Sequence, residues 1–62
     1  MRVPLNSRVV ILMDLYDSDN KEQLAWQGDK GTIIMFFDGA AIVKSDRNGL
    51  EISVDANEFR II

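Results

Sequence analysis

The sequence predicts a small all-β domain, and three observations support this fold class. Its β-branched and aromatic runs, such as 32–37, are shorter than a typical helix. Apolar runs flank two dipeptides that favour tight hairpin turns, Asp38-Gly39 and Asn48-Gly49. Residues 50–54 alternate Leu, Glu, Ile, Ser and Val, as a half-buried strand does. Short strands joined by tight turns are typical of a small barrel or sandwich.

Length and composition limit how such a chain can be stabilised. Its 62 residues are enough for one domain, so we expect a single unit spanning 1–62. The chain contains no cysteine and no histidine, which removes disulfides and the usual zinc ligands. Because 47% of the residues are hydrophobic, packing of apolar side chains is expected to supply the core.

Charge and hydropathy narrow the classes of partner. Ten acidic and seven basic residues give a net charge of −3, which disfavours long-range attraction to a nucleic-acid backbone. The apolar stretch 9–13 is far too short for a membrane span or a signal peptide. We therefore expect a cytoplasmic protein with no membrane partner.

The predicted elements follow one another without linkers or repeats. A first strand is expected over Ser7–Met13, and the polar, acidic segment 14–29 is expected to form a long loop or an irregular hairpin. The remaining elements are strands at Thr32–Phe37, Ala40–Ser45 and Leu50–Val54, one short 3-10 turn at 55–58, and a last strand at Phe59–Ile62. These are the five strands of the predicted barrel.

Two-residue turns would fix how the strands pair. The first turn sets Phe36 opposite Ala41 and Ile34 opposite Val43. The second sets Val43 opposite Val54 and Ser45 opposite Ile52. One face then collects the expected core: Ile34, Phe36, Ala41, Val43, Leu50, Ile52 and Val54.

The motif order also resembles a known family. Gly28-Asp29-Lys30-Gly31-Thr32-Ile33, Val43-Lys44-Ser45 and the closing Phe59-Arg60-Ile61-Ile62 resemble the "GDxGTV", "VEF" and "LxxI" segments of small bacterial SH3-like and KOW-like proteins. This resemblance covers nearly the whole chain and implies a five-stranded SH3-like barrel. Many members of that group have no known function, so the resemblance supports a prediction of the fold better than a prediction of the activity.

A looser resemblance links the chain to eukaryotic SH3 domains, which bind proline-rich peptides. Leu15-Tyr16-Asp17 is similar to part of "ALYDY", and 24–29 is similar to "ELSFxxGD". The Trp-Trp pair is absent, and "PSNY" is reduced to Ala56-Asn57-Glu58. A proline-peptide groove of the usual kind is therefore not expected.

Two groups of residues are candidates for binding a partner. The face opposite the expected core would carry an apolar patch that a solitary domain rarely exposes, unless the curvature and ends of the barrel cover it. The residues of this patch are Ile33, Met35, Phe37 and Ile42. Tyr16 and Trp26, at the ends of the polar loop, could either anchor a partner or cap the barrel mouth.

The acidic loop has two further interpretations. Its carboxylates, Asp14, Asp17, Asp19, Glu22 and Asp29, could attract a basic peptide or a hard cation, or could simply be solvated. Counting from Asp17, a calcium loop would require Gly at the sixth position and Glu at the twelfth, where this chain has Glu22 and Gly28. We therefore predict no metal site and no other cofactor.

The function expected from the sequence is binding without catalysis. No His or Cys is present and no serine has an evident base, so an enzyme is not predicted. The first hypothesis is a protein-interaction module or small assembly subunit, as a homo-oligomer or with another protein. The alternatives are a KOW-like RNA-binding domain that uses Lys30, Lys44 and Arg47, and a binder of a basic or proline-rich peptide.

Overall fold

A computed structural model describes residues 5–62, and this part of the chain is built almost entirely from strands and turns. Strands make up 52% of it and no α-helix occurs in it. The strands are β1 (Arg8–Ile11), β2 (Leu15–Tyr16), β3 (Gln23–Ala25), β4 (Lys30–Phe37), β5 (Ala40–Ser45), β6 (Glu51–Val54) and β7 (Phe59–Ile61). A single 3-10 turn, η1 (Ala56–Glu58), precedes β7. The all-β class predicted from the sequence is therefore confirmed.

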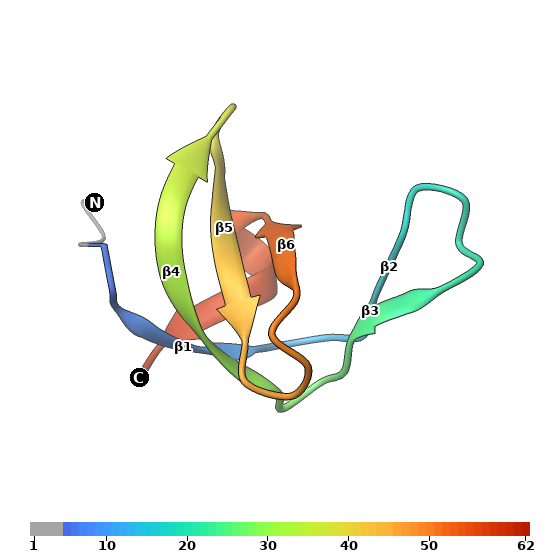
Figure 1. The fold of residues 1–62 in the computed structure, drawn as a ribbon, viewed down its shortest axis with the longest axis horizontal. Helices are drawn as coiled ribbons and strands as arrows, with labels where there is room; N and C mark the ends of the chain where they lie inside the picture. The colour runs from blue at the N-terminus through green and yellow to red at the C-terminus, as the bar shows by residue number, and fades with distance from the viewer. Residues whose placement is uncertain (1–4) are drawn as a thin grey trace.

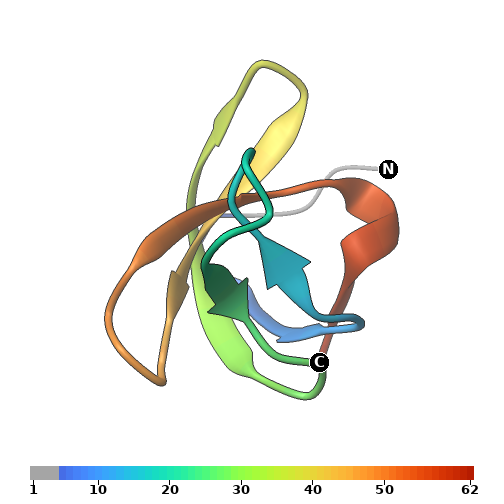
Figure 2. The ribbon, with the colours of Figure 1, turned by 90° about the vertical axis from the view of Figure 1, so that its right-hand side faces the viewer.

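Five of these strands form one antiparallel sheet in the order β6-β5-β4-β1-β7, and β2 pairs with β3 in a separate two-stranded hairpin. Figure 1 shows the β4–β5 hairpin rising past β6, while the β2–β3 hairpin projects from the other side of the molecule. In the view of Figure 2 the sheet curls around its interior instead of lying flat. Strands β6 and β7 are the two edges of this sheet.

Several local features agree with the turn chemistry of the sequence. The Asp38-Gly39 turn has φ angles of +54° and +81°, as a primed two-residue turn requires, and Phe37 pairs with Ala40 across it. The polar segment 14–29 contains the β2–β3 hairpin with a register irregularity, which is the irregular-hairpin alternative. The 3-10 turn lies at 56–58, and the Asp55 N–H donates to Glu58 Oε1 at 2.9 Å.

The predicted orientation of two residues in β4 is wrong. Ile34 was expected to point into the core and Ile33 away from it, but a bulge at Ile34 reverses this. Phe36 pairs with Ala41 as expected, but Val43 lies opposite Ile33 because the register shifts between Ile33 and Met35. A bulge places two residues against one and so reverses which side chains point inward. Ile33 therefore enters the core and Ile34 is only half-buried.

The predicted two-residue turn at Asn48-Gly49 is also wrong. Ser45 and Leu50 flank a four-residue loop, in which the Gly49 N–H donates to the Ser45 carbonyl and the Ser45 N–H donates to the Leu50 carbonyl. Val43 consequently lies opposite Ile52, and Ala41 lies opposite Val54. The shift is two residues, so Ile52 and Val54 keep their inward facing, whereas Leu50 is exposed.

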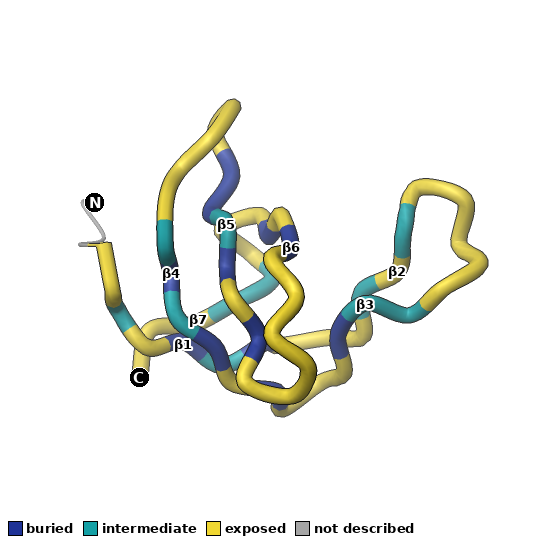
Figure 3. Tube along the Cα trace, in the orientation of Figure 1, coloured by how far each residue is buried: buried dark blue, intermediate teal, exposed yellow. Residues whose placement is uncertain are grey.

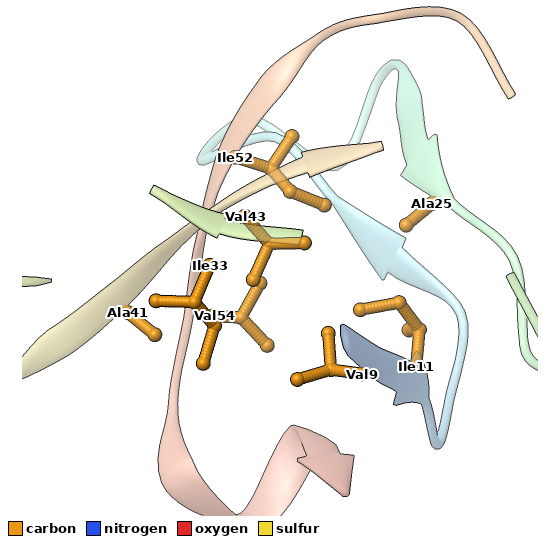
Figure 4. Packing of buried hydrophobic residues seen from close by; sticks show 8 residues of the cluster. All are labelled: Val9, Ile11, Ala25, Ile33, Ala41, Val43, Ile52 and Val54. Atoms are coloured by element: carbon orange, nitrogen blue, oxygen red, sulfur yellow. The ribbon is translucent and has the colours of Figure 1, made fainter. Parts of the chain in front are cut away.

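The core lies between the curled sheet and the base of the β2–β3 hairpin. Figure 4 shows its eight buried side chains converging from β1, β3, β4, β5 and β6: Val9, Ile11, Ala25, Ile33, Ala41, Val43, Ile52 and Val54. Leu15, Leu24 and Phe59 pack against this cluster. Of the seven expected core residues, Phe36 and Leu50 are instead about half exposed.

Residues 5–62 include no helix of the length and hydropathy needed to cross a membrane.

Candidate functional site: an apolar hairpin tip

The end of the β4–β5 hairpin carries three consecutive large apolar side chains that are open to solvent. Met35 is 46% exposed, Phe36 is 47% exposed and Phe37 is 67% exposed. We call these three residues the apolar tip. Because successive strand residues point to opposite faces, Met35 and Phe37 lie on one face of the hairpin and Phe36 lies on the other. Single exposed apolar residues are common, but large apolar side chains exposed on both faces of one hairpin need an explanation.

The tip lies where β4 has lost its neighbour on one side. Within residues 5–62, β1 pairs with β4 only from Lys30 to Thr32, and the last contact on that side is the Asn6 N–H donating to the Ile33 carbonyl at 2.7 Å. On the other side, β6 pairs with β5 as far as Ala41, the partner of Phe36, so the described sheet is three-stranded at Met35 and Phe36 and two-stranded only at Phe37 and Ala40. Figure 3 shows the turn and the β4 side of the tip as exposed.

The apolar patch predicted from the sequence is correct only in part. Met35 and Phe37 are exposed, but Ile33 is completely buried and cannot belong to a surface, which corrects the prediction. Ile42, which pairs with Met35, is half-buried. Phe36 was assigned to the core and belongs to the tip instead. Phe36 lies beyond Thr32, the last residue of β4 that pairs with β1, and sequence alternation does not mark this limit.

The other two predicted partner-binding residues lie on the β2–β3 hairpin, away from the apolar tip (Figure 1). Tyr16, on β2, is 50% exposed, and Trp26, directly after β3, is 38% exposed. Leu15 and Ala25 pair across this hairpin and pack at the core, so Tyr16 and Trp26 lie on its outer face. The structure does not bring these rings together with the tip.

A buried carboxylate organises the surroundings of Trp26. Asp29 is 9% exposed, and its Oδ2 accepts a hydrogen bond from the backbone N–H of Trp26 at 3.1 Å. Arg47, from the β5–β6 loop, donates to the same carboxylate through Nε at 3.0 Å and Nη2 at 2.7 Å. The Arg47 guanidinium also lies 4.6 Å from the centre of the Trp26 ring. We call Trp26, Asp29 and Arg47 the clamp, and sequence reasoning did not identify it.

The electrostatics of the clamp favour its charged form. Hydrogen bonds from Arg47 lower the pKa of Asp29, and burial of the carboxyl opposes this only in part. The same hydrogen bonds raise the pKa of Arg47. Both groups are therefore ionised at neutral pH, and the clamp is an ion pair that ties the β3–β4 turn to the β5–β6 loop.

A second ion pair lies beside the clamp. Arg8 on β1 donates to both carboxylate oxygens of Asp46 and to Thr32 Oγ1, the latter at 2.8 Å. The hydrogen bond from Arg8 lowers the pKa of Asp46. Neighbouring residues 46 and 47 of one loop are thus each paired, one as an acid and the other as a base.

The remaining acidic residues of segment 14–29 have partly structural roles. Asp14 Oδ1 accepts the Gln27 N–H at 2.8 Å. Asp17 Oδ1 accepts the N–H groups of Asp19 and Lys21 at 3.2 and 2.9 Å, which closes the hairpin loop. Within residues 5–62, the acidic side chains do not gather in a group of three that could hold a metal ion.

Comparison of the chain with protein-family models, with curated proteins and with solved structures yields no match. The function of this chain is therefore inferred from the geometry of its candidate site.

Proposed function

We propose that this chain is a cytoplasmic, non-catalytic protein-interaction module with an SH3-like fold, and that it docks through the apolar tip.

The SH3-like architecture is supported by the order of the elements. A meander of β4, β5 and β6 is joined to a first and a last strand that pair with each other, β1 with β7. A 3-10 turn leads directly into the last strand, as the family resemblance leads us to expect. The long irregular hairpin between the first strand and β4 also fits this pattern.

The observation that carries the docking surface is the run of exposed apolar residues at the end of the β4–β5 hairpin. Three side chains that are 46–67% exposed precede a two-residue turn and lie beyond the part of β4 that β1 covers. Large side chains on a preordered element lose little conformational entropy when they are buried against a partner. Such a hairpin suits insertion into an apolar site or addition to another sheet.

The geometry favours a protein partner over RNA. The RNA alternative depends on Lys30, Lys44 and Arg47, and Arg47 is already engaged by Asp29. Lys44 lies opposite Glu51 in the β5–β6 pairing, which offsets its charge. With a net charge of −3 in addition, little positive potential remains to attract phosphates.

The geometry also favours the tip over the peptide alternative built on Tyr16 and Trp26. The Arg47 guanidinium lies against the Trp26 ring, so one face of that ring is occupied. Asp14, Asp17 and Asp29 accept backbone N–H groups of their own segment, which gives these carboxylates a role in folding. An exposed Tyr16 alone is a smaller feature than the apolar tip.

The proposal is tested by NMR with the isotope-labelled chain at low micromolar concentration, alone and in an extract of the cells that encode it. We expect the amide signals of Met35, Phe36 and Phe37 to broaden or shift in the extract. We expect Phe37→Lys to suppress that change, because a buried unpaired charge costs several kcal/mol.

Tyr16→Ala is the matched control, since it removes an exposed ring from the other hairpin and should leave the response of the tip unchanged. A response confined to Tyr16 and Trp26 would contradict the docking surface. Well-dispersed spectra that are the same in buffer and in extract, and the same at low micromolar and at millimolar concentration of the chain, would contradict the interaction module itself.

A further inference from the structure

The apolar tip includes a stretch of sheet edge that lacks a strand partner within residues 5–62. On the β1 side, backbone pairing of β4 ends at Ile33, which donates to the Ser7 carbonyl and accepts from the Asn6 N–H. Leu5 and Asn6 then form a turn with Asn6 at φ +67°. Among the residues that the structure describes, Met35, Phe36 and Phe37 pair only with β5, and Ile34 lies at the bulge.

The backbone of Phe36 faces this free edge. Phe37 and Ala40 close the two-residue turn and form a hydrogen-bonded pair, so the adjacent pair, Phe36 and Ala41, is a non-bonded one. In an antiparallel ladder, the residue of a non-bonded pair directs its N–H and C=O to the opposite side. Phe36 therefore presents one donor and one acceptor to any strand that adds there.

We propose that the strand that adds is the same segment of a second copy of this chain. This inference specifies the partner of the proposed docking surface and rests on that proposal. The two β4 tips run antiparallel about a two-fold axis at Phe36, and the two Phe36 residues exchange N–H···O=C bonds. Met35 of each copy then lies opposite Phe37 of the other.

The segment is complementary to itself, which is why a second copy fits it. A two-fold interface requires one surface to match its own image, and a residue that offers both a donor and an acceptor on the axis meets this condition. Met35 against Phe37 is a favourable sulfur–aromatic contact, and it occurs twice. The stretch from Ile34 to Phe37 has none of the charged side chains that usually protect an exposed edge.

Charge does not oppose the pairing. The nearest charged residue along the strand is Asp38, which the register sets opposite Ile34 of the second copy. The two Asp38 residues are then four positions apart along the strands, roughly 13 Å at the usual rise per residue. This separation exceeds the screening length of about 8 Å at physiological ionic strength, so their repulsion is small.

The exposed area predicts a weak dimer. Full burial of a large aromatic side chain removes 150–250 Å² from solvent, so the tip offers roughly 300 Å² per copy. Standard interfaces bury about 800 Å² per partner, and we therefore expect the dimer to dissociate at low micromolar concentration. A test must consequently trap the dimer or work at high concentration.

Because the chain has no cysteine, single-cysteine variants provide such a trap. Phe36→Cys sets two thiols on the axis with a Cα separation of about 5.5 Å, which is within the range of a disulfide. Phe37→Cys is the matched control. In the proposed dimer the two cysteines introduced at this position would not lie opposite each other but two positions apart along the strands. Their Cα atoms would then be farther apart than the limit of about 7 Å for a disulfide. The fold of both variants is checked by amide dispersion.

Under mild oxidation at about 200 μM, we expect Phe36→Cys to form the covalent dimer at least tenfold faster than Phe37→Cys. Random collision predicts the reverse, because Phe37 is the more exposed position, at 67% against 47%. Equal rates, a faster Phe37→Cys, or no dimer from either variant would overturn the second copy as the partner. If the tip still responds to the cell extract in that case, the proposed function stands with a different partner.

Discussion

Ile33 and Phe37 lie on the same strand, yet their surroundings are opposite. Ile33 is completely buried among the side chains of the core, whereas Phe37 is 67% exposed at the hairpin tip. A buried aliphatic side chain stabilises the fold through both its removal from water and its close packing. An exposed ring contributes little to the free energy of unfolding, whatever it contributes to binding.

Substitutions at these two residues should therefore separate stability from docking. We expect Ile33→Val to lower the free energy of unfolding by about 1 kcal/mol, and Ile33→Ala by about 2–5 kcal/mol. The larger loss would unfold much of a domain this small, because its single core rarely supplies more than about 3–5 kcal/mol. Phe37→Ala should change stability by less than about 0.5 kcal/mol.

The free energy of unfolding of all three variants is measured by urea denaturation, with tryptophan fluorescence as the signal. A loss at Phe37→Ala equal to that of Ile33→Val would mean that the tip is packed in solution and is not a free surface.

At the scale of elements, the strands could be predicted from the sequence and the details of their pairing could not. β-branched runs and the Asp38-Gly39 turn were enough to find β4, β5 and β6 to within two residues at each end. The bulge could not be found, because Ile33 and Ile34 are equally apolar and either could point inward. The four-residue loop at 46–49 is set by local hydrogen bonds, such as Asn48 Oδ1 accepting the Leu50 N–H, which hydrophobic alternation does not encode.

The candidate site was predicted only in part for related reasons. Met35 and Phe37 were identified from alternation, which is a local property. Phe36 was not, because alternation placed it on the same face as the core residues, and how far the core extends along β4 is not a local property. The clamp requires Asp29 and Arg47 to meet through folding, although 18 residues separate them along the chain. Nothing in the sequence around either residue signals that contact.

β4 and β5 approach each other closely at Gly31. A Cβ atom at this position would lie 2.5 Å from Val43 Cγ1 and 2.7 Å from the Lys44 carbonyl oxygen. A side chain can rotate away, but the carbonyl belongs to the backbone of β5, so the strands themselves would have to separate. We expect Gly31→Ala to lower the free energy of unfolding by about 1–3 kcal/mol.

Ser53→Ala, on the exposed face of β6, is the control and should stay within about 0.5 kcal/mol of the wild type. Chemical denaturation of both variants makes the comparison. A Gly31→Ala protein as stable as the wild type would show that the two strands have room to part.

For the molecule as a whole, two ion pairs connect segments that are distant in the chain. Asp46 pairs with Arg8 of β1, and Arg47 pairs with Asp29 of the β3–β4 turn. The Asp46 N–H also donates to the Lys30 carbonyl at 2.9 Å. The β5–β6 loop is thereby attached to β1, to the β3–β4 turn and to the first residue of β4, and the first two attachments depend on ionised carboxylates.

Stability should therefore fall in acid. The pKa values of Asp29 and Asp46 are lower in the folded chain than the ordinary value near 4, so the unfolded chain takes up protons first. The contribution of the two pairs is fully present above that ordinary value and is lost as the pH falls through the lower, folded-state pKa values. We expect the urea midpoint to be level from pH 7 to about 5 and to drop below about pH 4.

Asp29→Asn removes one of the two carboxylates that form these ion pairs. This variant should be less stable than the wild type at pH 7, and its midpoint should depend less steeply on acid. Parallel pH profiles for the two proteins would show that the clamp does not contribute to the acid sensitivity.

The adjacent acid and base at 46 and 47 also show what bulk properties leave out. A chain in which Asp46 and Arg47 are exchanged has the same isoelectric point, the same amino-acid composition and the same mean hydropathy. It would nevertheless set arginine against Arg8 and aspartate against Asp29, so each attraction would become a repulsion. Part of the information that specifies this structure therefore lies in the order of the residues, which amino-acid composition does not contain.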